Sequence, residues 1–166
     1  MLIQQGYLEA GIEEILAGLE KQKAHGLYHI MPLRRAQVAY GYAMCGQLDR
    51  AREQIELAYS VMNNTGERTH EAKVNHLHGE VLRLTGDDAG AMSQFERAIA
   101  VAQQQQAKTF ELQATISLAR LLGAQGLHGE AHRRLAAVEA WFPVDVHIPD
   151  LVEARSLLAD LAHSFS

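Results

Sequence analysis

Two histidines four residues apart, His128 and His132, are the strongest candidates in this sequence for a metal site. On a helix this spacing places both imidazoles on one face, where they can bind the same ion. The stretch reads HGEAH, whereas a zinc protease requires HExxH, and a third ligand would have to come from elsewhere. We therefore predict structural or surface histidines, and metal binding through this pair is the weaker alternative.

The other residues with reactive side chains also favour a structural interpretation. His76 and His78 are two apart, so on a helix they point about 200° from one another and cannot chelate one ion by themselves. Cys45 directly precedes Gly46 at a predicted helix end, where a small packing residue is expected rather than a reactive thiol. The sequence contains no GxxxxGK[ST] phosphate loop, no GxGxxG motif after a strand and no GxSxG elbow. We predict no catalysis and no cofactor.

Composition and charge exclude further classes of function. The 166 residues are 48% hydrophobic and 21% charged, which suits one globular domain with a buried core. The net charge of −5 argues against nucleic acid or an anionic membrane as a partner. No apolar run has the length of a membrane span, and the start lacks the pattern of a signal peptide. A single cysteine excludes an internal disulfide, and we expect a cytoplasmic protein.

A repeat of 40 residues organises the chain, because steps of that length back from Gly126 reach Gly86, Gly46 and Gly6. Small and large apolar residues recur at fixed places around these glycines: Ala39, Gly79 and Ala119 before them, and Gly11, Ala51, Ala91 and Ala131, then Ile15, Ile55, Phe95 and Leu135, then Gly18, Ala58, Ala98 and Val138 after them. A second series, Gly26, Gly66 and Gln106, marks the other turn of each repeat.

Each repeat reads as helix, tight turn, helix. Apolar residues recur three and four positions apart, which is the period of an amphipathic helix. A glycine just past each first helix can adopt the left-handed conformation that ends a helix. No repeat can bury its apolar face alone, so the repeats must stack. The predicted helices cover residues 8–24, 28–45, 48–64, 68–85, 88–105, 107–125, 128–142 and 151–163.

This arrangement resembles the tetratricopeptide repeat (TPR), in which a small residue, an aromatic or leucine, Gly, Ala, Phe and Ala follow one another. Here those slots hold Gly79, Leu82, Gly86, Ala91, Phe95 and Ala98. The usual TPR period is about 34 residues, so a longer period lengthens the helices. The resemblance implies an all-α fold, a right-handed α-α superhelix or TPR-like solenoid of about 3.5 helix-turn-helix repeats with a C-terminal capping helix.

The repeat also sets the expected domain organisation. We expect one TPR-like domain over residues 1–166, with repeats at about 1–26, 27–66, 67–106 and 107–142 and a capping helix at 150–163. Few residues precede Gly6, so we expect a C-terminal fragment of a larger protein that begins within a repeat. The alternative is that helix 8–24 acts as an N-terminal cap with a polar outward face. Trp141 and Phe142 are expected in the core, against the capping helix.

Most of the chain, at 63–87, 106–142 and 149–161, is similar to the C-terminal TPR region of large bacterial signalling proteins. These proteins join a class III adenylate/guanylate cyclase or a DNA-binding domain to an AAA-like NTPase. The shared motifs are Gln-Ala-Lys at 106–108, Ala-Thr at 114–115, Ser-Leu-Ala-Arg at 117–120, Trp-Phe at 141–142 and Pro-Asp-Leu at 149–151. The sequence departs from them at Ile116 and in the loop 143–147. The resemblance implies a regulatory region, with any NTPase or cyclase activity in upstream domains.

TPR proteins bind partners in a concave groove lined by the first helix of each repeat, and the resemblance carries these positions onto this chain. They are Leu33, Ala36, Tyr40, Ala43 and Met44, then Lys73, His76, Glu80, Arg83 and Leu84, then Gln113, Ile116, Arg120, Gly123 and Ala124. We select as partner-binding residues Tyr40, Met44, Lys73, His76, Glu80, Arg83, Gln113 and Arg120. Their basic side chains suit carboxylates, and Tyr40 and Met44 suit apolar groups, of an amphipathic helix or an extended peptide.

These observations favour a non-catalytic module for protein–protein interaction. The partner is a protein segment or peptide, and the NTPase core of the parent chain is one candidate. A second hypothesis is a homo-oligomer, such as a homodimer, that uses the unpaired N-terminal face. The third and least favoured is a metal-binding protein that uses His128 and His132. Nucleic acid and membrane are not expected partners.

Overall fold

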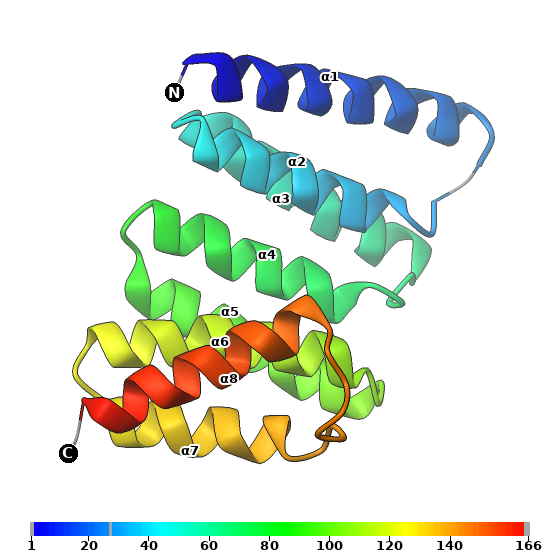
Figure 1. Cartoon of the computed structure of the whole chain (residues 1–166). Helices are drawn as coiled ribbons and strands as arrows, with labels where there is room; N and C mark the ends of the chain where they lie inside the picture. Colours follow the sequence, from blue (N-terminus) through cyan, green and yellow to red (C-terminus); the bar gives the residue numbers. More distant parts are fainter. Residues whose placement is uncertain (1, 27, 165–166) are drawn as a thin grey trace. The chain divides into compact units, whose positions relative to one another are not determined.

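The computed structural model describes residues 2–26 and 28–164, and side-chain environments from residue 8 onward. Within these ranges the chain forms eight α-helices and no strand (Figure 1). The helices are α1 (Leu2–Ala24), α2 (Met31–Met44), α3 (Leu48–Thr65), α4 (Glu71–Leu84), α5 (Asp88–Gln104), α6 (Lys108–Ala124), α7 (His128–Glu139) and α8 (Pro149–His163). They form an N-terminal unit, Met1–Ala91, and a C-terminal unit, Met92–Ser166. The prediction of an all-α, helix-turn-helix architecture is confirmed.

Three turns end their first helix in the same way. Gly46, Gly86 and Gly126 have φ values of 74°, 83° and 79°. The amide that follows each glycine donates a hydrogen bond to the carbonyl four positions before the glycine: Gln47 to Tyr42 at 2.9 Å, Asp87 to Leu82 at 3.0 Å and Leu127 to Leu122 at 2.9 Å. This is the Schellman motif, which a residue without a Cβ closes at little cost. The equivalence of these three glycines is confirmed.

The fourth predicted turn glycine does not form a turn. Gly6 lies inside α1, which runs without interruption from Leu2 to Ala24. A glycine inside a helix costs only about 1 kcal/mol relative to alanine, so the backbone can continue through it. The prediction of a turn at Gly6 and a helix that begins at residue 8 is therefore wrong. Glu9, Glu13 and Glu20 of α1 are exposed.

The second turn series keeps its backbone conformation even where the glycine is missing. Gly26 and Gly66 have φ values of 69° and 74°, and Gln106 has a φ of 55°. Among the described residues, Gln106 is the only non-glycine residue with a positive φ. The amide after it, that of Ala107, donates to the carbonyl of Ala102 at 2.8 Å. The place of Gln106 in the repeat thus determines its left-handed conformation, although a residue with a Cβ disfavours a positive φ.

We expect Gln106→Gly to stabilise the protein. A side chain in the left-handed region costs roughly 1–2 kcal/mol, and part of this is offset by the greater freedom of glycine in the unfolded chain. The free energy of unfolding, measured by urea titration, should rise by about 0.5–1 kcal/mol. Ala100→Gly, at an exposed position inside α5, is the control and should lower it by about 1 kcal/mol. A loss of stability in both variants would contradict this account.

Small residues allow the two helices of a repeat to approach closely in the N-terminal unit. A buried stripe on α2 packs against a buried stripe on α3, and α4 closes the cluster. Its members are Ala36, Ala39, Ala43, Ala51, Ile55, Ala58, Met62, Val74, Leu77 and Val81. In the C-terminal unit, α8 packs on both α6 and α7. Phe95, Leu112, Leu118, Leu135 and Leu151 are fully buried there.

Candidate functional site

The predicted partner-binding residues of α4 form one chain of polar contacts along the helix. Lys73 Nζ donates to His76 Nδ1 at 3.1 Å, and His76 Nε2 lies 3.8 Å from Glu80 Oε1. Arg83 holds the other carboxylate oxygen, Glu80 Oε2, through Nε at 3.0 Å and through Nη2 at 2.9 Å. The spacing of three and four residues places all four side chains on one side of the helix. The ends of this row are cations, which suits a partner with carboxylates.

His76 is an interior residue of this row. It is only 8% exposed, so its direct contact area for a partner is small. Burial, together with the nearby Lys73 ammonium, lowers the pKa of His76 from 6.5 to about 3. Glu80 is close enough to favour the charged imidazole, but Arg83 already binds this carboxylate, and burial outweighs it. His76 is therefore neutral at physiological pH, and its Nδ1 accepts the hydrogen bond that orients Lys73.

The buried His76 should make stability depend on pH. Below about pH 6.5 the unfolded chain takes up a proton at this residue, whereas the folded chain stays neutral there until about pH 3. Stability is therefore complete above pH 6.5 and falls by up to about 1.4 kcal/mol per pH unit as the pH decreases. Urea titrations between about pH 7 and 5 should show a flatter slope in His76→Gln than in the wild type. His29→Gln, at an exposed position, is the control, and equal slopes in all three proteins would contradict the assignment.

The α2 side of the site is apolar. Met44 is 55% exposed at the end of α2, and Leu84 is 39% exposed at the equivalent end of α4. Tyr40 is half-buried and packs against the core cluster of the N-terminal unit. Because α2 packs directly on α4, the predicted residues of both helices belong to one compact unit. We name this surface, formed by Tyr40, Met44, Lys73, Glu80 and Arg83, the α2–α4 face.

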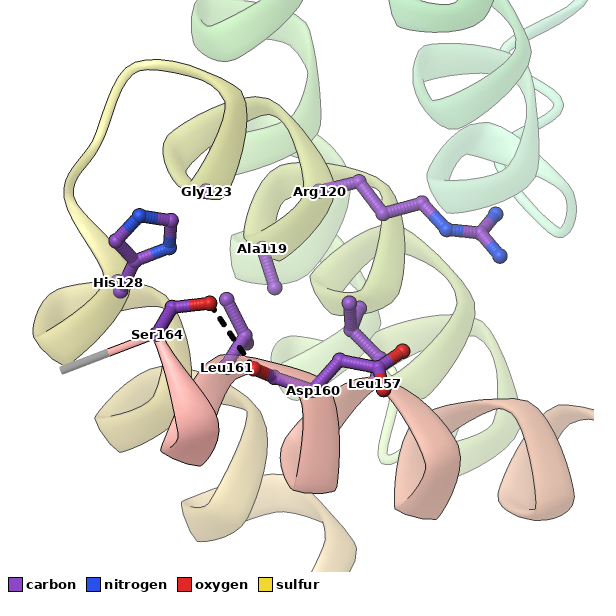
Figure 2. Close-up of a pocket in the computed structure, with 8 residues that line it drawn as sticks. All are labelled: Ala119, Arg120, Gly123, His128, Leu157, Asp160, Leu161 and Ser164. Atoms are coloured by element: carbon purple, nitrogen blue, oxygen red, sulfur yellow. Dashed lines mark hydrogen bonds between the residues drawn. The ribbon is translucent and has the colours of Figure 1, made fainter. Parts of the chain in front are cut away.

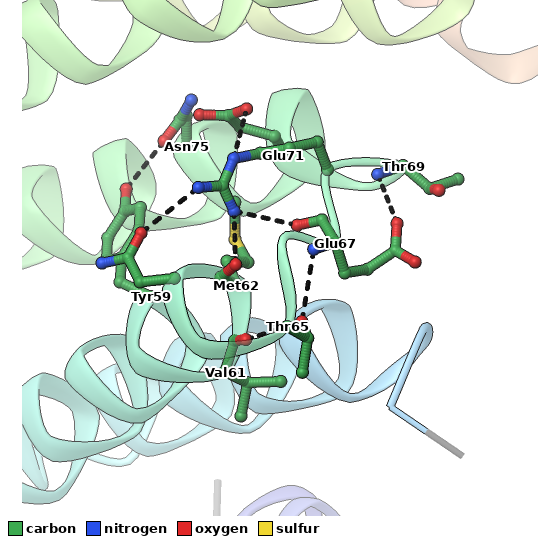
Figure 3. Close-up of polar contacts among 10 residues, drawn as sticks. Tyr59, Val61, Met62, Thr65, Glu67, Thr69, Glu71 and Asn75 are labelled. Atoms are coloured by element: carbon green, nitrogen blue, oxygen red, sulfur yellow. Dashed lines mark hydrogen bonds and ion pairs between the residues drawn. The ribbon is translucent and has the colours of Figure 1, made fainter. Parts of the chain in front are cut away.

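The turn before α4 holds that helix in place. Arg68 Nη1 donates to the carbonyl of Met62 at 2.6 Å and to that of Glu67 at 3.1 Å, and its Nε lies 3.5 Å from Glu71 Oε2. The Glu67 carboxylate accepts the amide of Thr69 at 2.7 Å, and hydrogen bonds from the Thr69 hydroxyl and amide lower the pKa of Glu67 (Figure 3). The turn therefore links the end of α3 to the start of α4.

Polar contacts of Tyr59 also fix α4 against α3. Its hydroxyl donates to Asn75 Oδ1 at 2.8 Å, and this carboxamide is fully buried (Figure 3). The Tyr59 oxygen lies 3.1 Å from His78 Nδ1, and the two rings meet edge to face with centroids 5.6 Å apart. Since the hydroxyl has one proton, His78 must donate from Nδ1. This contact agrees with a structural interpretation of His78, which is half-buried rather than part of the core.

In the C-terminal unit, α8 contacts the predicted residues of α6. Gln113 Nε2 donates to Asp150 Oδ2 at 2.7 Å, and Arg120 Nη1 lies 2.9 Å from Glu153 Oε1. The Arg120 side chain is still 59% exposed, so its guanidinium can also meet a partner. Asp150 and Glu153 lie about one helical turn apart on α8, so Gln113 and Arg120 of α6 can bind two carboxylates with this spacing.

A shallow pocket of about 210 Å³ opens between α6, α8 and the start of α7 (Figure 2). It is lined by Ala119, Arg120, Gly123, His128, Leu157, Asp160, Leu161 and Ser164. Arg120 and Gly123 are positions that the TPR resemblance assigns to the groove. The volume is below the roughly 300–1,000 Å³ of small-molecule sites, so the pocket suits one side chain of a partner better than a cofactor.

The histidine pair does not gather further metal ligands. His128 lies at the start of α7 on the pocket wall, and His132 lies one turn further along the same helix, half-buried. In the part of the chain that the structure describes, no three His, Cys, Asp or Glu side chains come together in a way that could hold a metal ion.

Partial burial and the nearby Glu9 carboxylate raise the pKa of the Cys45 thiol, which disfavours a thiolate nucleophile.

The prediction that Trp141 lies in the core is wrong. We expected it in the core, but it is 59% exposed. Helix α7 ends at Glu139 rather than at residue 142, so Trp141 lies in the following turn. Its ring meets Phe142 edge to face, with centroids 5.1 Å apart, and Lys108 Nζ lies 5.9 Å from its centroid. Of these two aromatic residues, Trp141 is exposed and Phe142 is half-buried.

Comparison with solved structures gives the fold. A crystal structure of a kinesin-light-chain-like protein of Podosopora anserina with nearly identical TPR-like repeats matches 98% of this chain and 81% of its own, with 20% identity and a TM-score of 0.69. A crystal structure of a substituted form of that protein matches 98% of this chain and 80% of its own, with 20% identity and a TM-score of 0.70. The fold is a TPR-like helical repeat. No protein-family model matches the chain, and no curated protein sequence matches it.

Sequence reasoning missed the relation of α8 to the repeat. We predicted only a capping helix, but Ala159 lies 40 residues after Ala119, in the small-residue slot of a first helix. The same step of 40 places α8 in the position of a first helix. Among the described residues, no helix combines the length and the apolar character that crossing a bilayer requires.

Proposed function

We propose that this chain is a non-catalytic docking module that binds a protein segment along the first helices of its repeats. The observation that carries the proposal is the pocket between α6 and α8, since Arg120 and Gly123, two expected groove residues, line it. The α2–α4 face supports the same function with exposed Met44 on α2 and the cation Arg83 on α4. The fold alone does not imply a partner, so the proposal rests on these residues.

The chemistry of the two surfaces defines the partner. Lys73, Arg83 and Arg120 offer ammonium and guanidinium groups to carboxylates, and guanidinium can bind a carboxylate with two hydrogen bonds. The pocket and Met44 accept apolar side chains, and methionine adapts its shape to different ligands. We propose a peptide or amphipathic helix that alternates acidic and large apolar residues.

Selection from a displayed random-peptide library tests this proposal. Enriched peptides should carry acidic and apolar residues, and their affinity should be measured against variants of each surface. Lys73→Glu/Arg83→Glu reverses the charge on α4, and Asp160→Trp places an indole over the pocket from its exposed rim. At least one of these should weaken binding about tenfold or more, which is about 1.4 kcal/mol.

Arg52→Glu is the matched control for charge reversal, because Arg52 is exposed on α3, outside both surfaces. It should change affinity by less than about twofold, or roughly 0.4 kcal/mol. Equal binding to all three variants would exclude both surfaces as the docking site.

We also propose that the module belongs to a cytoplasmic bacterial signalling protein and regulates the NTPase core of the same parent chain. The motifs at 106–108, 117–120 and 149–151 support this proposal. The genomic sequence upstream of the Met1 codon tests it. An open reading frame that continues upstream and encodes an NTPase domain is expected, and an in-frame stop codon directly upstream would contradict it.

A further inference from the structure

The only tryptophan of the chain lies in the turn between α7 and α8, where it is exposed to solvent. Trp141 is 59% exposed, and Val144, three residues further along the turn, is 87% exposed. Large apolar side chains that gather on a surface mark contact sites more often than single ones do. Tryptophan is also enriched among the few residues that supply most of the binding energy of an interface. This turn is therefore a candidate contact surface.

Arg155 of α8 holds the turn in one conformation. Its Nη1 donates to the carbonyl of Val146 at 3.1 Å and to that of Val144 at 3.4 Å, and its Nη2 donates to the carbonyl of Pro143 at 3.3 Å. Its Nε donates to Glu139 Oε1 at 2.7 Å. A side chain on a fixed backbone loses little conformational entropy when it binds. The exposed indole is thus presented on a preorganised turn.

The pocket between α6 and α8 offers the three features that an indole requires (Figure 2). Leu157 and Leu161 supply apolar walls. Arg120 supplies a guanidinium, and among aromatic rings tryptophan attracts a cation most strongly. This side chain is 59% exposed although its Nη1 binds Glu153. The indole N–H is a donor only, and Asp160 on the exposed rim offers a carboxylate acceptor.

The indole and the pocket of the same copy cannot meet, because α7 separates them. This helix begins at His128 on the pocket wall and ends at Glu139, two residues before Trp141. A helix of 12 residues is about 18 Å long, so Trp141 lies near the opposite end of α7 from the pocket. A contact between the indole and the pocket must therefore join two copies of the chain.

We propose that the Trp141 indole of one copy occupies the pocket between α6 and α8 of a second copy. The inference rests on the docking function proposed for this pocket and names an occupant for it. Each copy offers the indole at one end of α7 and the pocket at the other, so the contact is heterologous and adds further copies. One side chain in a pocket is a small interface, so we expect a dissociation constant between about 10 µM and 1 mM.

Two variants that each lose one half of the contact test the proposal. Trp141→Ala keeps the pocket and contains no tryptophan. Asp160→Phe keeps Trp141 and places a ring over the pocket from its exposed rim. In sedimentation equilibrium up to about 1 mM chain, the average mass of the wild type should pass that of a dimer, whereas each variant alone should remain a monomer. Their equimolar mixture should form a dimer and nothing larger.

Tryptophan fluorescence follows the same mixture directly, since Asp160→Phe carries its only fluorescent indole. Addition of Trp141→Ala should move its emission progressively to shorter wavelength as the indole leaves water. Trp141→Ala/Asp160→Phe lacks the indole and the open pocket, and its addition should leave the emission unchanged. Trp141→Ala/Ser93→Phe is the matched control, because Ser93 is exposed on α5 and does not line the pocket. It should act like Trp141→Ala, and the melting temperature of each variant confirms that it is folded.

The proposal is overturned if the emission does not move at about 1 mM Trp141→Ala, or if it moves equally with Trp141→Ala/Asp160→Phe. A peptide selected from the displayed library separates this failure from a failure of the docking function. A peptide that binds the wild type but not Asp160→Phe, while the wild type stays monomeric, would show that the pocket docks another polypeptide and that only its occupant was wrong. Equal peptide binding to both, with a monomeric wild type, would exclude the pocket as a docking site and the inference with it.

Discussion

Phe95→Ala should lower the free energy of unfolding by about 3–5 kcal/mol. Phe95 is the large residue of the second helix α5, and its side chain is 0% exposed. It occupies the slot that Ile55 and Leu135 fill in α3 and α7, where those residues are 3% and 0% exposed. Alanine would lose the apolar transfer energy of the ring and leave a cavity that helices of fixed spacing cannot fill.

Urea titration followed by far-ultraviolet circular dichroism measures this loss. Phe95→Leu retains most of the volume and should cost less than about half as much. Ser93→Ala, at an exposed position of the same helix, is the control and should stay within about 0.5 kcal/mol of the wild type. A loss below about 1 kcal/mol in Phe95→Ala would show that this slot does not support the stacked repeats.

Leucine at Ala39 should destabilise the protein, whereas leucine at Ala159 should not. Both residues occupy the small-residue slot of a first helix. Ala39 is 0% exposed and packs within the α2–α3 cluster, so three extra carbon atoms force the helices apart. We expect a cost of about 1–3 kcal/mol, as for other overpacked cores.

Ala159→Leu is the internal control for this effect. The residue is exposed on α8, so at low protein concentration its variant should unfold within about 0.5 kcal/mol of the wild type. Thermal and urea unfolding at the same chain concentration compare the two variants. Equal effects of both substitutions would contradict the assignment of Ala159 to an uncovered face.

The turns could be predicted from sequence because a left-handed backbone constrains residue type. Gly46, Gly86 and Gly126 follow this rule. Gln106 does not, yet its place in the repeat still identified the turn. The rule fails in the other direction at Gly6, since glycine is also tolerated inside a helix at a cost of about 1 kcal/mol. A glycine therefore permits a turn without requiring one.

The candidate site could be predicted only in part. Helical spacing identified which residues of α4 share a side, and the structure places Lys73, His76, Glu80 and Arg83 in one row of contacts. Spacing does not give burial, so the inaccessible position of His76 could not be read from it. Spacing also does not give the end of a helix accurately. Helix α7 ends at Glu139 rather than at residue 142, and the prediction of a buried Trp141 failed for that reason.

Backbone amide chemical shifts, recorded on the full chain with and without a selected peptide, test most directly that the first helices form the docking surface. We predict that the largest shifts fall on Tyr40, Met44 and Arg83 of the α2–α4 face or on Arg120 and Gly123 beside the pocket. Shifts concentrated instead on the exposed side of α3, at Arg52, Glu53 and Glu56, would contradict it.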